Sequence, residues 1–104
     1  MNTMLFILYV GLLDKDTKRQ EISTSKAHEI VTDIFVEKIG GATISNAIGV
    51  YTHNDGTIVH ENTIRIECFG AMEKDILWCV DYLKKAFNQE SIAICKQELI
   101  SQFV

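Results

Sequence analysis

Two glutamates, Glu61 and Glu90, are the residues of this chain best suited to acid–base chemistry. General acid–base catalysis needs two carboxyl groups beside one substrate atom, with their pKa values held apart. Because the two glutamates lie far apart in the chain, the fold must bring them together before they can act as a pair. If it does not, helix capping and turn bracing are the roles that remain for them.

A second group of residues suits the binding of a small anionic or nucleotide-like ligand. Aromatic faces stack on a base, and a guanidinium holds a phosphate. The candidate ligand-binding residues are Tyr9, Tyr51, Arg65, Phe69, Gln89 and Ser91. The alternative is that Tyr9 and Phe69 pack in an interface and that Arg65 pairs with Glu67 or a cross-strand acid.

The histidines and cysteines show no pattern typical of a metal or nucleophilic site. They are His28, His53, His60, Cys68, Cys79 and Cys95, without an H-x-x-x-H or C-x-x-C spacing. No glycine-rich loop opens a helix, as a phosphate cradle would require. We therefore expect no metal, no cofactor and no catalytic residue of these kinds.

Apolar periodicity predicts six elements in the order β-α-β-β-α-β. Strands are expected at 4–11, 42–52, 57–69 and 91–99, one helix from a Ser23 or Ser25 cap to Gly40-Gly41, and a second helix over 71–88. This order indicates an α+β fold of the ferredoxin-like, split β-α-β type. It predicts a four-stranded antiparallel-rich sheet with two helices on one face, in a single domain over 1–104.

Strand direction decides which candidate residues meet. We expect the first and third strands to run parallel to each other and the second and fourth to run the other way. Glu61, Tyr51 and the hairpin turn at 54–56 would then lie at one end of the sheet, and Gln89, Glu90 and Ser91 at the other. This arrangement predicts that Glu61 and Glu90 stay apart within one subunit.

Residues 4–10 are apolar at successive positions, so both faces of the first strand need cover. The helices cover one face. The other face carries either the Leu5/Ile7/Tyr9 row or the Phe6/Leu8/Val10 row, together with Arg65 and Phe69. An open apolar face of this kind favours a homodimer or a higher even oligomer. A ligand is expected at that interface, near Tyr9, Arg65 and Phe69, bordered by Gln89 and by residues 12–22 as a flap or a solvated loop.

Composition narrows the possible partners. The net charge of −4 argues against nucleic acid, which requires a basic face. Residues 4–13 are apolar but too few to span a bilayer, and they lack the basic start of a signal peptide. Unpaired cysteines favour a reducing compartment. We expect a cytoplasmic protein with no nucleic-acid and no membrane partner.

From Leu8 to Phe103 the chain resembles the bacterial family catalogued as domain of unknown function 3574. The positions that carry the resemblance are Tyr9, Gly11, Gly41, Thr43, Gly49, Tyr51, Asp55-Gly56, Ile58, Val59, Glu61 and Gln89-Glu90-Ser91. Family members tend to have Trp at the position of Tyr51 and Gly at that of Asn88. The resemblance implies a small ferredoxin-like domain that associates through its open sheet face, and it implies no reaction.

Three functions follow from these observations. The first is a non-enzymatic, oligomeric protein that binds a small ligand, because no nucleophile–base pair or cofactor motif is present. The chain is similar in build to phage proteins that sequester nucleotide signals of bacterial immunity, which makes it a candidate phage anti-defence protein. The alternatives are a small enzyme that uses Glu61 or Glu90, and a protein–protein interaction module.

Overall fold

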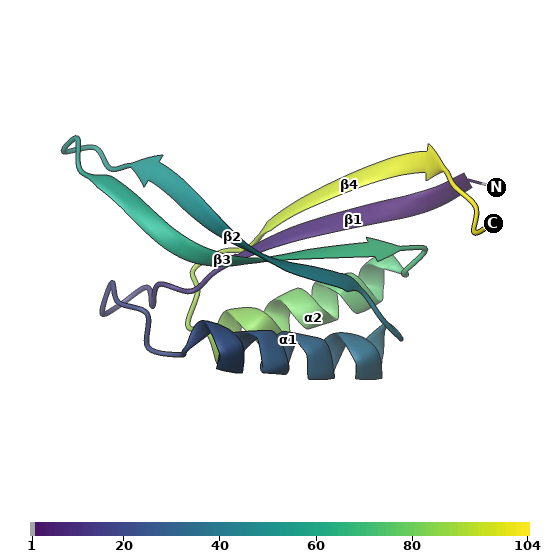
Figure 1. The fold of residues 1–104 in the computed structure, drawn as a ribbon, viewed down its shortest axis with the longest axis horizontal. Helices are drawn as coiled ribbons and strands as arrows, with labels where there is room; N and C mark the ends of the chain where they lie inside the picture. Colours follow the sequence, from purple (N-terminus) through teal and green to yellow (C-terminus); the bar gives the residue numbers. More distant parts are fainter. Residues whose placement is uncertain (1) are drawn as a thin grey trace.

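The computed structural model describes residues 2–104 and shows one sheet with two helices beneath it (Figure 1). The strands are β1 (Asn2–Gly11), β2 (Thr43–Thr52), β3 (Ile58–Phe69) and β4 (Ala93–Ile100), and the helices are α1 (Thr24–Lys38) and α2 (Glu73–Ala86). The strand order is β2-β3-β1-β4, and each neighbouring pair is antiparallel. The predicted ferredoxin-like fold is confirmed.

The predicted strand directions are wrong. β1 runs antiparallel to β3, with Tyr9 opposite Arg65 and Gly11 opposite Thr63. The physical reason is the connections: a helical crossover makes β1 and β2 parallel, and the tight turn makes β3 antiparallel to β2. The start of β3 and the approach to β4 therefore both lie beside the end of β1. Glu61 and Glu90 are at the same end of the sheet, not at opposite ends.

Local chemistry sets the limits of the first helix. The Ser23 hydroxyl accepts a hydrogen bond from the backbone N–H of Lys26 at 3.2 Å, so Ser23 and not Ser25 is the N-cap. The helix ends before Gly40, whose φ of +103° turns the chain in a way that glycine permits. Both ends agree with the sequence pattern.

The second helix is shorter than predicted. Its first turn carries Glu73 and Asp75 and its last turn Lys84 and Lys85, which complement the helix dipole. Met72 is the N-cap residue, and it is 60% exposed because it precedes the first turn of the helix.

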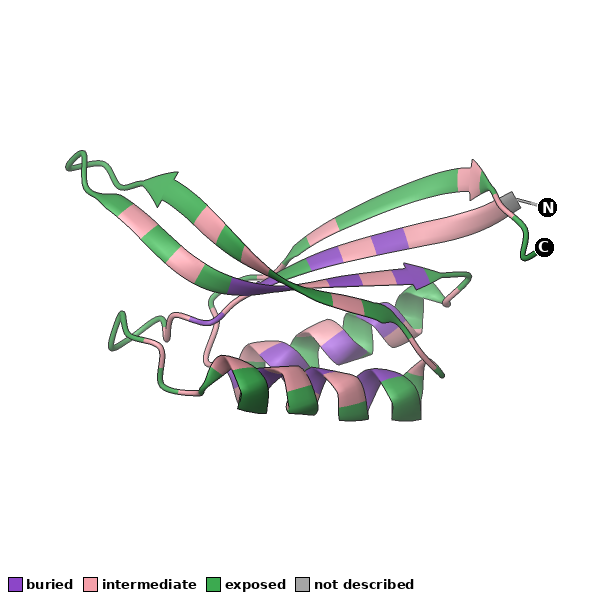
Figure 2. Cartoon of the chain, in the orientation of Figure 1, coloured by how far each residue is buried: buried purple, intermediate pink, exposed green. Residues whose placement is uncertain are grey.

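The core lies between the sheet and the helices (Figure 2). The sheet contributes the buried side chains of Phe6, Leu8, Val10, Ile64, Ile66 and Cys68, and the helices those of Ala27, Val31, Ile34, Phe35, Ile76, Cys79 and Leu83. The row Leu5, Ile7 and Tyr9 therefore lies on the open face, as do Arg65 and Phe69. The sequence pattern allowed either row of the first strand on the open face, and the structure places the row with Tyr9 there.

The sheet reaches beyond the helices at both ends (Figure 1). At one end the β2–β3 hairpin projects beyond the helices, and we call this projection the hairpin arm (Figure 1). The molecule measures 47 × 27 × 23 Å along its principal axes. Across residues 2–104, neither helix has the length and the apolar character that crossing a membrane requires.

Candidate functional site

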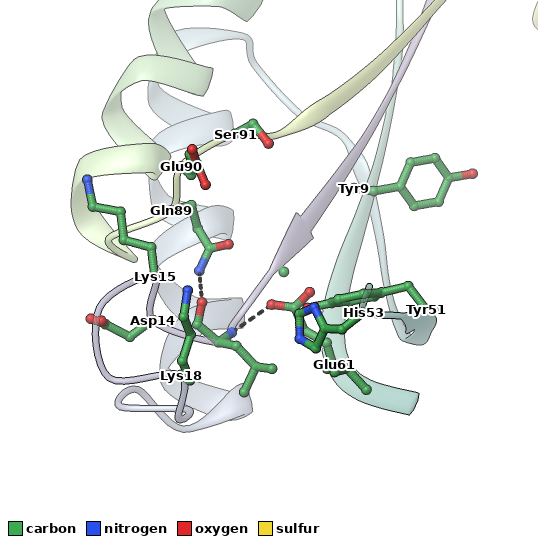
Figure 3. Close-up of a pocket in the computed structure, with 13 residues that line it drawn as sticks. Tyr9, Asp14, Lys15, Lys18, Tyr51, His53, Glu61, Gln89, Glu90 and Ser91 are labelled. Atoms are coloured by element: carbon green, nitrogen blue, oxygen red, sulfur yellow. Dashed lines mark hydrogen bonds between the residues drawn. The ribbon is translucent and has the colours of Figure 1, made fainter. Parts of the chain in front are cut away.

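A groove of about 470 Å³ opens where β1 ends, between the hairpin arm and residues 12–22. Its lining combines aromatic, acidic, basic and amide side chains: Tyr9, Gly11, Leu13, Asp14, Lys15, Lys18, Tyr51, His53, Val59, Glu61, Gln89, Glu90 and Ser91 (Figure 3). The volume falls in the usual range for small-molecule sites. Segments that are remote in the chain meet here because β3 and β4 both start beside the end of β1.

The Glu61 carboxylate is held at the end of β1 by a hydrogen bond and by close packing. The backbone N–H of Leu13 donates to its Oε2 at 2.9 Å. Its carboxylate also packs against the backbone of Gly11, where a Cβ would come within 2.5 Å of Cδ and of both carboxylate oxygens. Two residues further along β3, the hydroxyl of Thr63 donates to the backbone carbonyl oxygen of Glu61 at 3.1 Å. The carboxylate is therefore held in one position at the end of β1.

Tyr51 lies beside Glu61 on the hairpin arm (Figure 3). Burial, and then the negative charge of Glu61, raise the pKa of the Tyr51 phenol above its usual value of 10.0. The phenol therefore stays protonated at neutral pH and can donate a hydrogen bond. His53 meets the Tyr51 ring edge-on, with 5.6 Å between ring centroids, which supports the position of the ring.

Residues 12–22 form the opposite wall, and side-chain amides attach them to the chain between α2 and β4. Asn88 donates through Nδ2 to Asp14 at 3.0 Å and to Asp16 at 2.8 Å. Gln89 donates through Nε2 to the carbonyl oxygen of Leu13 at 2.6 Å. This segment places Lys15 and Lys18 on the lining. In the part of the chain that the structure describes, neither lysine forms a salt bridge.

Four of the six predicted ligand-binding residues meet at the groove: Tyr9, Tyr51, Gln89 and Ser91. Arg65 and Phe69 do not line it. Arg65 pairs with Glu67 at 2.9 Å, and its guanidinium lies 5.9 Å from the centroid of the Tyr9 ring. Phe69 lies at the far end of β3 and lines a smaller hollow with residues 101–103. A ligand role for these two residues remains a prediction.

The prediction that Glu61 and Glu90 lie apart is wrong, because both side chains line the groove. The hairpin turn was the signal that could have placed them together. It makes β2 and β3 antiparallel, and with a helical crossover between β1 and β2 the direction of β3 follows. The sequence prediction also missed Leu13, whose contribution is a backbone amide that no side-chain pattern reveals.

The buried cysteines are not nucleophiles. Burial is the main cause that raises the pKa of the Cys68 and Cys79 thiols to about 11. Among residues 2–104, no three histidine, cysteine, aspartate or glutamate side chains gather as a metal site would require. The chemistry of the groove is therefore to be sought in its carboxylates, phenols and lysines.

Two solved structures are similar to this chain over most of its length. A phage SAM lyase in the apo state matches with a TM-score of 0.64 and 25% identity, over 91% of this chain and 79% of the lyase. A phage SAM lyase in complex with S-methyl-5'-thioadenosine matches with a TM-score of 0.63 and 25% identity, over 92% and 81%. No family model and no curated protein matches the chain. Membership of the domain of unknown function 3574 family remains a prediction.

Proposed function

We propose that this chain is a phage-type protein that binds S-adenosylmethionine in the groove and cleaves it to S-methyl-5'-thioadenosine. The observation that carries the proposal is the clamped carboxylate of Glu61 beside the Tyr51 phenol. It lies in a groove of nucleoside size, in a chain whose fold is similar to that of a phage SAM lyase over 91% of this chain and 79% of the lyase.

The charges of the groove favour this ligand over a phosphate-bearing nucleotide. Three carboxylates, from Asp14, Glu61 and Glu90, line it against the two lysines Lys15 and Lys18. S-Adenosylmethionine carries a sulfonium, an α-ammonium group and one carboxylate, so its net charge is positive. A phosphate would meet more repulsion than attraction in this setting. The expected nucleotide-like ligand is thus better taken as a cationic nucleoside than as an anion.

Each part of the ligand has a partner on the lining. The aromatic faces of Tyr9 and Tyr51 suit the adenine ring and the sulfonium, since cations and π systems attract each other. Glu61 is the countercharge for the cationic sulfur end. Lys18 is the partner for the methionyl carboxylate. Gln89 has its amide N–H groups committed to backbone carbonyls, so it supports the wall rather than binding through them.

The bond broken is set by the product. S-Methyl-5'-thioadenosine keeps the methyl and adenosyl carbons on sulfur, so the bond to the methionyl chain is the one that breaks. As this bond breaks, an oxygen of the methionyl carboxylate bonds to the γ-carbon and closes a five-membered lactone. Sulfur leaves with the bonding electron pair as a neutral thioether, so no proton is transferred. The groove therefore has to orient the methionyl chain and exclude water, a task that positioning alone can accelerate strongly.

Incubation of the purified protein with S-adenosylmethionine tests the proposal, with products followed by liquid chromatography and mass spectrometry. We expect S-methyl-5'-thioadenosine and a four-carbon fragment one water lighter than homoserine, since a lyase adds no water. Glu61→Gln should lower turnover by about 100-fold or more. Glu37→Gln on the exposed face of α1 is the matched control.

Recovery of the ligand intact, with saturable binding lost in Glu61→Gln, would instead establish the non-enzymatic function in which the protein sequesters the ligand. If the wild-type protein neither binds nor cleaves S-adenosylmethionine, the proposal is refuted and the interaction module is favoured.

A further inference from the structure

The peptide group of Leu13 is hydrogen-bonded on both sides, and the two partners come from opposite walls of the groove. Its N–H donates to Glu61 Oε2 at 2.9 Å, on the β3 side. The carbonyl oxygen of Leu13 accepts from Gln89 Nε2 at 2.6 Å, on the β4 side. Figure 3 draws both hydrogen bonds, with Gln89 above and the carboxylate of Glu61 to the right.

Gly11 supplies the space that the carboxylate occupies. A Cβ at this position would come within 2.5 Å of Cδ, Oε1 and Oε2 of Glu61, closer than non-bonded heavy atoms approach. Since φ of Gly11 lies outside the left-handed region, an alanine is compatible with this backbone and only the carboxylate stands in its way. The far end of a glutamate is flexible, so it would swing aside and lose its hydrogen bond to Leu13.

We propose that Gly11 and Gln89 are positioning residues for Glu61: Gly11 by leaving the carboxylate its place against the backbone, and Gln89 by holding the Leu13 peptide that binds it. Neither residue has to touch the ligand for this role. The importance of Glu61 for cleavage rests on the proposed function, whereas its position between Gly11 and Leu13 does not.

A mutant cycle tests the coupling. Gly11→Ala should lower turnover of S-adenosylmethionine by about tenfold or more in the wild-type background. In the Glu61→Gln background it should change turnover by less than about twofold, because residues that act through one group are not additive. Affinity for S-methyl-5'-thioadenosine, which lacks the cationic sulfur, should stay within about twofold of wild type. An equal loss of product affinity, or additive effects in the double variant, would overturn the proposal.

Gln89→Glu keeps the shape of the side chain and removes the amide donor to Leu13. Like Gly11→Ala, it should lower turnover of S-adenosylmethionine in the wild-type background and have little further effect in the Glu61→Gln background. Gln102→Glu, which lies after β4 at the opposite end of the sheet, introduces the same charge and serves as the matched control. A Gln89→Glu variant with wild-type turnover would remove Gln89 from the proposal.

A second measurement does not depend on the reaction. The backbone amide of Leu13, observed by nuclear magnetic resonance, reports the hydrogen bond to Glu61. In Glu61→Ala, in Gly11→Ala and in Gln89→Glu its proton should shift upfield, and its exchange with solvent should become about tenfold faster. If the wild-type protein does not cleave S-adenosylmethionine but these shifts occur, the proposed function fails and the positioning role stands. An unchanged Leu13 amide in Gly11→Ala would refute the positioning role.

Discussion

Glu61 shows how much a single carboxylate depends on groups that carry no functional side chain. Its partners are the backbone amide of Leu13 and the bare Cα of Gly11. Charge-assisted hydrogen bonds to backbone N–H groups are among the stronger ones in proteins. The neighbouring Tyr51 feels that negative charge, which together with burial raises the pKa of its phenol.

The three cysteines separate by accessibility. Cys68 and Cys79 are buried with pKa values of about 11, and Cys95 is exposed on β4. Only the thiolate reacts quickly, and a pKa of about 11 leaves roughly one buried thiol in 10,000 ionised at neutral pH. We expect a chromogenic disulfide reagent to modify Cys95 alone in the native protein and all three cysteines in denaturant. Rapid native labelling in a Cys95→Ser variant would contradict the burial.

Asn88 attaches residues 12–22 to the connection between α2 and β4. Its side chain donates hydrogen bonds to Asp14 and Asp16, and its backbone has a φ of +48°. Two variants separate its two contributions. Asn88→Ala loses the hydrogen bonds and strains the backbone, so it should lower the free energy of unfolding by about 2–3 kcal/mol. Asn88→Gly keeps the backbone relaxed and should cost about 1 kcal/mol.

Urea denaturation of both variants measures this difference. Equal losses of stability would show that backbone strain contributes nothing at this position.

Asp14 gives the same segment a dependence on pH. Hydrogen bonds from the Thr17 backbone and from Asn88 lower the pKa of Asp14 below its usual value of 3.8. Because the folded state holds the carboxylate ionised more readily than the unfolded state, the stabilisation is present above about pH 4 and is lost as the pH falls through the lowered pKa.

We therefore expect Asp14→Asn to lower the melting temperature at about pH 7 and to have a smaller effect at about pH 2.5. Thermal unfolding of the variant and the wild type across this range checks the sign. A difference that grows on acidification would mean that Asp14 stabilises the fold in its protonated form.

The whole molecule leaves one face of its sheet without helices, and Leu5, Ile7, Tyr9 and Phe69 lie on it. The exposed fractions of Tyr9 and Phe69 are 39% and 49%. Covering such a face with a second copy would remove apolar area from water and would place Tyr9, at the edge of the groove, next to the partner. The proposal of a homodimer or higher even oligomer rests on this face.

Light scattering at tens of micromolar tests the assembly, and a mass at twice the chain mass or a higher even multiple is expected. Ile7→Lys should shift the mass to that of the monomer without unfolding the protein. Val36→Lys, on the exposed surface of α1, introduces the same change away from the sheet. A monomeric wild-type protein would refute the proposal.

Sequence alone determined the elements, because their signals are local. The alternation of Ile64, Ile66 and Cys68 with Arg65 and Glu67 places one row in the core and the other on the open face. Capping and turn residues then set the element ends to within a few residues. The order of elements was enough to predict the fold, since few arrangements of β-α-β-β-α-β bury all the apolar faces.

Only the tertiary structure decided the site. Glu61 and Glu90 line one groove because β3 and β4 both lie beside β1 and run antiparallel to it. The hairpin turn indicates the direction of β3 relative to β2, but the order of the strands depends on how the connections cross the sheet. The place of Glu61 depends on the backbone of Gly11 and Leu13, where the deciding features are an absent Cβ and an amide N–H. Every residue has such a backbone, so its use at one position becomes visible only when distant segments are packed together.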